Sequence, residues 1–338
     1  MAEYKLKPFV DKYKTVIFDM DGVISSEQMY WNCAALTVYE LLNDKDYYGN
    51  QAIDRQWCID NVKALREKIF CNDTTIKLAK NIGVNSNWDL AYIVVCMAMI
   101  LHTKDDFDKV YDYTKTFDCN ALEMYDILAE LLSKKTSMPL EDCLRTGSLW
   151  KNVQVSFQDW YWGKGKTQGL CYNEQPLIDA EKLIIIMKLL YEKGITPCIG
   201  TGRPKREIIH PMTKWGIGKY MPENRRINYN HVLDAEAEFE KNGIDVALTK
   251  PHPFMFLKAM LGEEYPNDKI LNGDYDKSLV KTTLVVGDAG ADILASQAMG
   301  ADFLAVLTGI SGVEAKGYFE EQKAQYILDS LEQILEEE

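Results

Sequence analysis

The sequence is poor in the residues that build structural zinc sites. It has only four histidines, and none of its eight cysteines forms a C-x-x-C pair, so a structural zinc site is not expected. We expect the cysteines to be free and reduced, as is usual in the cytoplasm. The first residues, Met-Ala-Glu-Tyr-Lys, have no apolar stretch of the kind found in secretory signal peptides. These absences predict a cytoplasmic protein.

Long apolar runs and an excess of positive charge are also missing. The longest apolar run, Leu90 to Leu101, has twelve residues, well short of the ~20 that span a bilayer. It predicts a buried helix that begins after Ser86 or Asn87 as N-cap. The formal net charge is -13, whereas nucleic acids and anionic membranes are bound by basic surfaces. We therefore expect neither partner, and an anionic ligand would need cations placed locally.

The residues that are present divide into a helical stretch and an alternating stretch. Thr15 to Met20 is a short run rich in β-formers, which predicts a buried strand. From Glu27 to about Leu149 apolar residues recur at helical spacing, and 151–176 reads as an irregular return linker. From Leu177 onward, predicted strands at 195–200, 227–232, 245–248, 282–286 and 303–307 alternate with helices at 177–193, from 205, after 253, and at 291–299 and 318–336.

This alternation predicts an α/β fold with a Rossmann-like parallel sheet and helices on both of its faces. The predicted domains are an α/β core of residues 1–24 and 175–338, and a large all-helical domain of residues 25–174 inserted after the first core strand. Ligands of parallel sheets bind at the carboxyl ends of the strands.

Four short motifs fall at or just beyond such ends. They are Asp19-Met-Asp21-Gly-Val, Gly200-Thr201-Gly202-Arg203, Thr249-Lys250-Pro251 and Gly287-Asp288-Ala-Gly-Ala-Asp292. Together they supply two carboxylate pairs, a hydroxyl and an ammonium, which are the groups needed to hold Mg²⁺, attack a phosphate and neutralise its oxygens. Each motif alone has a plainer reading as a surface turn, a helix cap or a solvated lysine. Their combination favours a catalytic site.

If the site hydrolyses phosphate esters, each of the four motif carboxylates has an expected role. Asp19 is the candidate nucleophile, and Asp21 is the candidate acid and base that protonates the leaving oxygen and then activates water. Asp288 would ligate Mg²⁺, with Asp292 beside it as a further ligand or directly behind it.

The remaining motif residues would handle the phosphate group. Thr201 and the backbone N–H of Gly202 would bind its oxygens at a strand-to-helix junction, and Lys250 would supply a positive charge. Arg203 is either a phosphate or substrate contact or a surface residue.

The motifs resemble those of the haloacid dehalogenase-like (HAD) hydrolase superfamily. DMDGV resembles D-x-D-G-[TV], GTGR the second motif, TKPHP the form G-K-P-x-P, and VVGDAGADI the form G-D-x-x-x-D. The resemblance covers about 1–24 and 177–315. It implies a C1 cap in the helical insertion, as in the phosphatase and phosphoglucomutase-like branch, and Mg²⁺ bound by Asp19, the backbone carbonyl of Asp21, Asp288 and Asp292. After the first motif the chain reads Ile24-Ser-Ser-Glu27, where the family often has an acidic residue followed by Ser or Thr.

The prediction is a Mg²⁺-dependent phosphatase that hydrolyses a small phosphorylated metabolite through an aspartyl-phosphate on Asp19. The helical cap would gate access through hinges near 24–27 and 172–177. The halide and phosphonate branches of the superfamily typically alter the position that Asp21 occupies, so Asp21 favours phosphoryl chemistry. Two alternatives stay open: a phosphotransferase or sugar-phosphate mutase that uses the same phospho-aspartate, and a non-catalytic binding protein on this fold.

Overall fold

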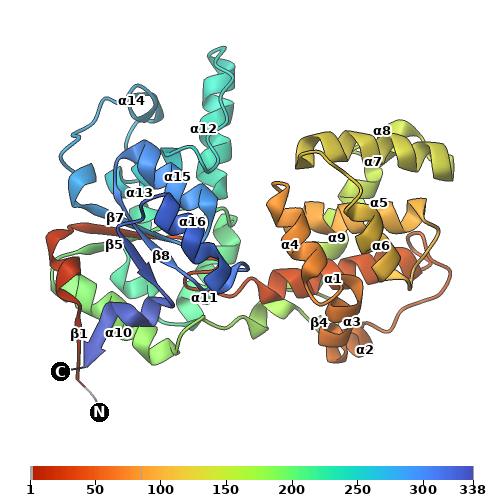
Figure 1. The fold of residues 1–338 in the computed structure, drawn as a ribbon, viewed down its shortest axis with the longest axis horizontal. Coiled ribbons are helices and arrows are strands. Elements are labelled where there is room, and N and C mark those ends of the chain that lie inside the picture. Colours follow the sequence, from red (N-terminus) through yellow and green to blue (C-terminus); the bar gives the residue numbers. More distant parts are fainter. Residues whose placement is uncertain (1–2, 85, 338) are drawn as a thin grey trace. The chain divides into compact units, whose positions relative to one another are not determined.

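The computed structural model describes residues 3–84 and 86–337. The chain separates into two compact units, Met1–Ser26 with Gln175–Glu338, and Glu27–Glu174. We call the first the α/β unit and the second the helical unit. Their elements are labelled in Figure 1.

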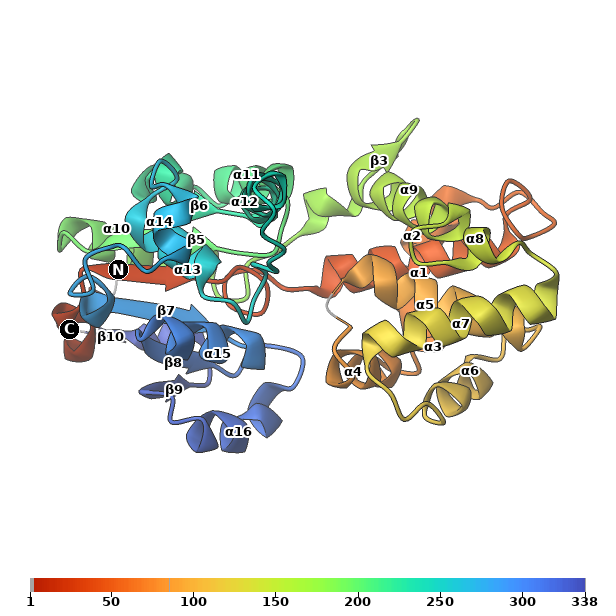
Figure 2. The same cartoon turned by 90° about the horizontal axis from the view of Figure 1, so that it is seen from above.

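The α/β unit contains a six-stranded parallel sheet in the order β6-β5-β2-β7-β8-β9, and the strands follow one another in this order in Figure 2. The predicted fold class is thereby confirmed. The strands of the sheet are β2 (Thr15–Phe18), β5 (Thr196–Gly200), β6 (Arg226–Ile227), β7 (Thr283–Gly287), β8 (Asp302–Val306) and β9 (Tyr326–Leu328).

Helices cover both faces of this sheet because successive strand residues point to opposite sides. Phe18 and Val286 face one hydrophobic core, which they share with α10 (Ala180–Glu192) and α11 (Lys205–Lys214). Ile17 and Val285 face a second core. Its helices are α12 (Tyr229–Lys241), α13 (Phe254–Leu261), α14 (Asn267–Leu271), α15 (Gly290–Met299) and α16 (Lys316–Glu321).

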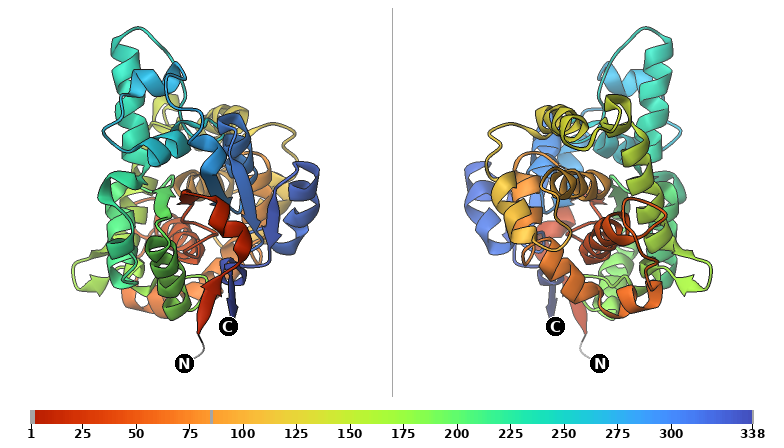
Figure 3. Two further views of the ribbon diagram at one scale, coloured as in Figure 1. Left: turned by 90° about the vertical axis from the view of Figure 1, so that its left-hand side faces the viewer. Right: turned by 90° about the vertical axis from the view of Figure 1, so that its right-hand side faces the viewer.

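The two ends of the described chain meet in a small antiparallel pair. In Figure 3 the red β1 (Tyr4–Leu6) lies beside the blue β10 (Leu335–Glu337). Short 3₁₀ turns connect the larger elements of the unit: η1 Pro8–Lys12, η3 Gly218–Tyr220, η4 Glu223–Arg225, η5 Val280–Thr282, η6 Gly312–Ala315 and η7 Leu331–Ile334.

The helical unit packs around α5 (Asn87–Ile100), whose residues Leu90 to Ala98 are all buried. Ser86 caps this helix by accepting from the backbone of Trp88 and Asp89, so the predicted buried helix and one of its two predicted caps are confirmed. Around it lie α1 Gln28–Asn43, α2 Arg55–Asp60, α3 Val62–Ile69, α4 Thr74–Asn81, α6 Phe107–Thr114, α7 Ala121–Thr136, α8 Leu140–Cys143, α9 Ser148–Trp162, the hairpin β3 Gly163–Lys164 with β4 Thr167–Gln168, and η2 Leu170–Asn173.

Several predicted elements are wrong. The strand expected at 227–232 is only β6, after which Asn228 caps α12, and 245–248 forms no strand. The long terminal helix at 318–336 is instead α16, β9, η7 and β10. The first half of the expected linker at 151–176 is helix α9, which buries Trp160 and Tyr161. Across 3–84 and 86–337, no helix is both long and apolar enough to cross a bilayer.

One ion pair, between the buried Asp89 and the partly exposed Arg145, ties α5 to the segment between α8 and α9 and yields a stability prediction. Asp89 is 2% exposed and accepts from Arg145 Nε at 2.9 Å, from Arg145 Nη2 at 2.8 Å and from Trp150 Nε1 at 2.8 Å. Asp89→Ala removes the acceptor of these three hydrogen bonds, so we expect it to lower the free energy of unfolding by about 2 kcal/mol. Urea unfolding followed by tryptophan fluorescence measures this change, since every tryptophan except Trp215 lies in the helical unit.

A matched control is Glu130→Ala, which removes an exposed pair with Lys134 in the same unit. This change should cost less than about 0.5 kcal/mol. Equal effects of the two substitutions would contradict a structural role for the Asp89 cluster.

Candidate active site

The first, second and fourth motifs leave the sheet at the same edge. Phe18, the last residue of β2, is in register with Ile199 of β5 and with Val286 of β7. The backbone N–H of Asp19 donates to the carbonyl of Val286 at 3.0 Å. Because the strands are parallel, the residues that follow them emerge side by side.

Three of the predicted carboxylates form a cluster at this edge. Asp19, Asp288 and Asp292 each offer one oxygen, and these oxygens all lie within 4.8 Å of one another. The Asp19 side chain is 14% exposed and that of Asp292 is 1% exposed. Asp292 is also fixed by the backbone N–H of Ala289, which donates to its Oδ2 at 3.3 Å.

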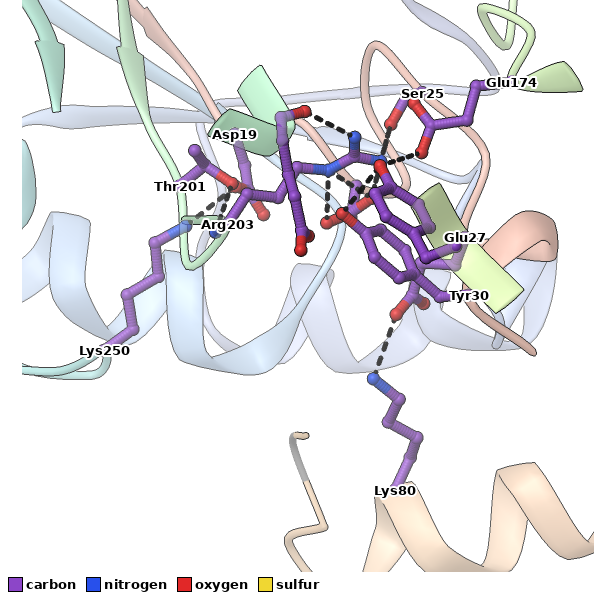
Figure 4. A network of polar contacts seen from close by, with 12 residues as sticks. Asp19, Ser25, Glu27, Tyr30, Lys80, Glu174, Thr201, Arg203 and Lys250 are labelled. Carbon is purple, nitrogen blue, oxygen red and sulfur yellow. Dashed lines mark hydrogen bonds and ion pairs between the residues drawn. The ribbon is translucent and has the colours of Figure 1, made fainter. Parts of the chain in front are cut away.

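Lys250, from the third motif, bridges two members of the cluster. Its Nζ lies 3.1 Å from Asp19 Oδ1 and 2.8 Å from Asp292 Oδ1, and it sits 4.7 Å from the centre of the Phe256 ring. Figure 4 shows the ammonium directed at Asp19. Burial opposes the charged form of this lysine, but Asp19 and Asp292 outweigh burial, so the pKa of Lys250 is raised.

The surroundings of Asp19 disfavour its ionised form. Burial raises the pKa of Asp19 to about 7, with Asp292 and Asp21 adding to the rise and Lys250 and the backbone N–H of Met20 opposing it. The Oδ1 atom of Asp19 is buried, and the Lys250 ammonium lies 3.1 Å from it. A nucleophilic carboxylate in this setting needs a further positive charge to stay ionised.

Two glycines leave the room that Asp288 occupies. A Cβ placed on Gly22 or on Gly309 would overlap with Asp288 Oδ2, and Gly22 also has a φ of +74°. Thr308 Oγ1 donates to the carbonyl of Gly22 and so ties the first motif loop to the segment after β8. Sequence reasoning identified Gly22 but missed Thr308 and Gly309, which belong to none of the four motifs.

The predicted phosphate-binding loop follows β5. Thr201 is fully buried, its backbone N–H donates to Ile227 at 3.1 Å, and its Oγ1 accepts from the N–H of Arg203 at 3.3 Å. Gly202 is exposed and has open space where a side chain would lie.

Asp21 lies outside the three-carboxylate cluster and is held by different partners. Arg203 Nη2 lies 2.6 Å from Asp21 Oδ1, and Arg203 Nε lies 3.0 Å from Oδ2. Ser25 Oγ donates to Asp21 Oδ1 at 3.3 Å and accepts from Arg203 Nη2 at 2.5 Å. Sequence reasoning left Arg203 between a ligand contact and a surface residue; it is 3% exposed and paired with Asp21.

The residues present fit a divalent cation of the Mg²⁺ type. The cluster supplies only hard carboxylate oxygens, which Mg²⁺ prefers, and one of them, Asp19 Oδ1, is buried with only the Lys250 ammonium close to it. A divalent ion would also offset the negative charge that Lys250 alone leaves on these three carboxylates.

Comparisons with known proteins point to one family. A scan against protein-family models matches residues 247–334 to the family described as HAD-hydrolase-like. A search of curated proteins gave no significant match. A search of solved structures gave, among others, a structural-genomics target with 27% identity and a TM-score of 0.76, covering 95% of this chain and 97% of the other.

Two more distant structures have informative names. One is a candidate phosphoglycolate phosphatase from Lactobacillus delbrueckii subsp. bulgaricus, with 18% identity, a TM-score of 0.49 and coverage of 95% and 96%. The other is the phosphatase Tt82 from Thermococcus thioreducens, with 14% identity, a TM-score of 0.48 and coverage of 85% and 90%. At these values their likeness carries no argument about chemistry.

The family match includes Lys250 of the third motif and Asp288 and Asp292 of the fourth motif. The α/β unit has the parallel sheet with helices on both faces that the alternation of strands and helices predicted. Residues 247–334 therefore match the HAD-hydrolase-like family, in agreement with the resemblance to the haloacid dehalogenase-like hydrolase superfamily that the motifs carry.

Proposed function

We propose that the protein is a Mg²⁺-dependent phosphatase that hydrolyses a small phosphorylated metabolite through an aspartyl-phosphate on Asp19. The observation that carries this proposal is the pairing of Lys250 with both Asp19 and Asp292 at the carboxyl edge of the sheet. It combines a buried carboxylate, a cation and a hard-oxygen cluster in one place.

In the first step an oxygen of Asp19 forms a bond to phosphorus, and the bond from phosphorus to the leaving oxygen breaks. Asp21 gives its proton to that oxygen. In the second step Asp21 takes a proton from water, the water oxygen bonds to phosphorus, and the bond from phosphorus to Asp19 breaks. Inorganic phosphate leaves and Asp19 is restored.

The main obstacle is electrostatic, because a carboxylate must approach a phosphate of like charge. At ~4 Å and an effective dielectric constant of ~20, two unit charges repel by about 4 kcal/mol. Lys250 offsets part of this repulsion. When bound, Mg²⁺ supplies the remaining positive charge at the transferring group. Thr201 and the N–H of Gly202 bind phosphate oxygens.

The helical unit is the proposed cap, and it would recognise the part of the substrate other than phosphate. The chain passes from one unit to the other twice. The first passage directly follows the first motif in the sequence, and the second is paired with the first through backbone contacts. Ser25 pairs with Pro176, and the N–H of Leu177 donates to the carbonyl of Ile24 at 2.9 Å. We propose these segments, 24–27 and 172–177, as the hinges.

A test combines a substrate panel with one substitution. With Mg²⁺, the protein should release inorganic phosphate from at least one sugar phosphate, nucleotide or phospho-acid, and Asp19→Asn should lower kcat by at least about 10³-fold because the nucleophile is lost. Rapid quenching with radiolabelled substrate should leave the label on the peptide that contains Asp19. Asp234→Asn, at an exposed position on α12, is the control and should leave the rate unchanged.

Other results would point elsewhere. Turnover that requires a bisphosphate primer and transfers the label to a sugar would favour the mutase, which uses the same phospho-aspartate. Full activity of Asp19→Asn would end the proposed mechanism. No turnover on the whole panel, with a stable complex recovered instead, would favour a binding protein.

A second test concerns the metal site. Gly22→Ala forces a Cβ into the space of Asp288 Oδ2, so we expect the dissociation constant for Mg²⁺ to rise by tenfold or more, which titration calorimetry measures directly. Gly243 has nearly the same φ, +75°, but no atom within 4 Å of an added Cβ. Gly243→Ala therefore carries the same backbone strain without the clash and should leave the Mg²⁺ affinity unchanged.

Gly309→Ala provides an independent check, because it meets the same oxygen of Asp288 from a different loop. Unchanged Mg²⁺ affinity in both Gly22→Ala and Gly309→Ala would remove Asp288 from the proposed metal site.

A further inference from the structure

Arg203 is built into the fold at both of its ends. Its backbone N–H donates to Thr201 Oγ1 at 3.3 Å, and its Nη1 donates to the carbonyl of Glu207 in α11 at 3.3 Å. Its head group makes the two-pronged contact with Asp21 and the contact with Ser25 described above. The guanidinium is only 2% exposed, whereas the Asp21 side chain is 25% exposed. The arginine is thus a fixed group that holds a carboxylate still open to solvent.

These contacts hold the Asp21 side chain in one position. A carboxylate two residues from Asp19 could turn toward the metal-binding cluster and become one more ligand there, but Asp21 does not belong to that cluster. A planar guanidinium that contacts both oxygens fixes the position and the rotation of a carboxylate, which a lysine cannot do.

We infer that Arg203 is a positioning residue for acid and base catalysis, with Ser25 as its second anchor. The inference rests on the proposed function and deepens it. Arg203 joins the phosphate-binding loop at Thr201 to the side chain of Asp21, so the bound phosphate and the proton donor keep one fixed spacing. Misplacement of a reacting group by about 1 Å can cost on the order of 10²-fold in rate.

The test uses leaving groups of different basicity. A poor leaving group, such as the alkoxide of a sugar or glycerol phosphate, needs the proton from Asp21, whereas 4-nitrophenolate leaves without help. Asp21→Asn should therefore slow alkyl phosphates much more than 4-nitrophenyl phosphate. Arg203→Met should do the same, lowering kcat for alkyl phosphates by on the order of 10²-fold with KM little changed. Arg203→Lys should be intermediate, since it keeps the charge and loses the planar fork.

Two further variants separate positioning from folding. Ser25→Ala removes the second anchor with little change in volume and should shift the leaving-group dependence in the same direction, by less. Arg226→Met is the matched control: Arg226 is a partly buried arginine of the same unit whose guanidinium donates to the carbonyls of Gly218 and Met221. It should lower the melting temperature and leave the leaving-group dependence as it is.

The double variant Asp21→Asn with Arg203→Met decides the case. If Arg203 acts through Asp21, the double variant is no slower than Asp21→Asn alone. If Arg203→Met instead slows all substrates equally, or adds its full effect to that of Asp21→Asn, the inference is overturned while the proposed function stands. If Asp21→Asn itself shows no leaving-group dependence, the acid role of Asp21 fails, and the inference fails with it.

Discussion

Repulsion between like charges is the constraint around which the α/β unit is arranged. Four carboxylates meet at one edge of the sheet, and each of the two cations present is committed to particular partners: Lys250 to Asp19 and Asp292, and Arg203 to Asp21. Burial raises the pKa of Asp19, and the nearby carboxylates of Asp292 and Asp21 add to that rise. A site that is left two positive charges short is suited to a divalent cation, and its remaining oxygens are of the kind that Mg²⁺ accepts.

The backbone makes this crowding possible. Parallel pairing of β2 with β5 and β7 brings three chain segments to the same edge, and glycines at 22 and 309 clear the space for Asp288. The carboxylates are then divided into two groups by their partners. Asp19, Asp288 and Asp292 share one cluster, and Asp21 is kept out of it by Arg203 and Ser25.

The sequence predicted the strands that carry motifs, and it did so for a physical reason. Segments such as Thr15 to Phe18 and Thr283 to Gly287 are short and apolar, which indicates burial, and acidic residues follow them, which indicates where each strand ends. The strand predicted at 227–232 was wrong because its residues suit a strand, whereas in the structure Asn228 caps a helix that begins there. In α9, aromatic residues of modest helix propensity concealed a helix that burial stabilises. The partner of Arg203 could not be read from the sequence, because spacing does not say which distant carboxylate a buried guanidinium will meet.

The place of the insertion has a consequence for how the chain reaches its folded state. Thr15 of β2 pairs with Thr196 on one side and with Thr283 on the other, so this inner strand of the sheet is made before the insertion and both of its neighbours are made after it. The intervening residues 27–174 form a continuous segment with its own apolar interior. During synthesis on the ribosome this segment can collapse early, whereas β2 must wait for partners of high sequence separation, and such contacts close slowly. Until then, an apolar strand with two unpaired edges is open to pairing with other chains.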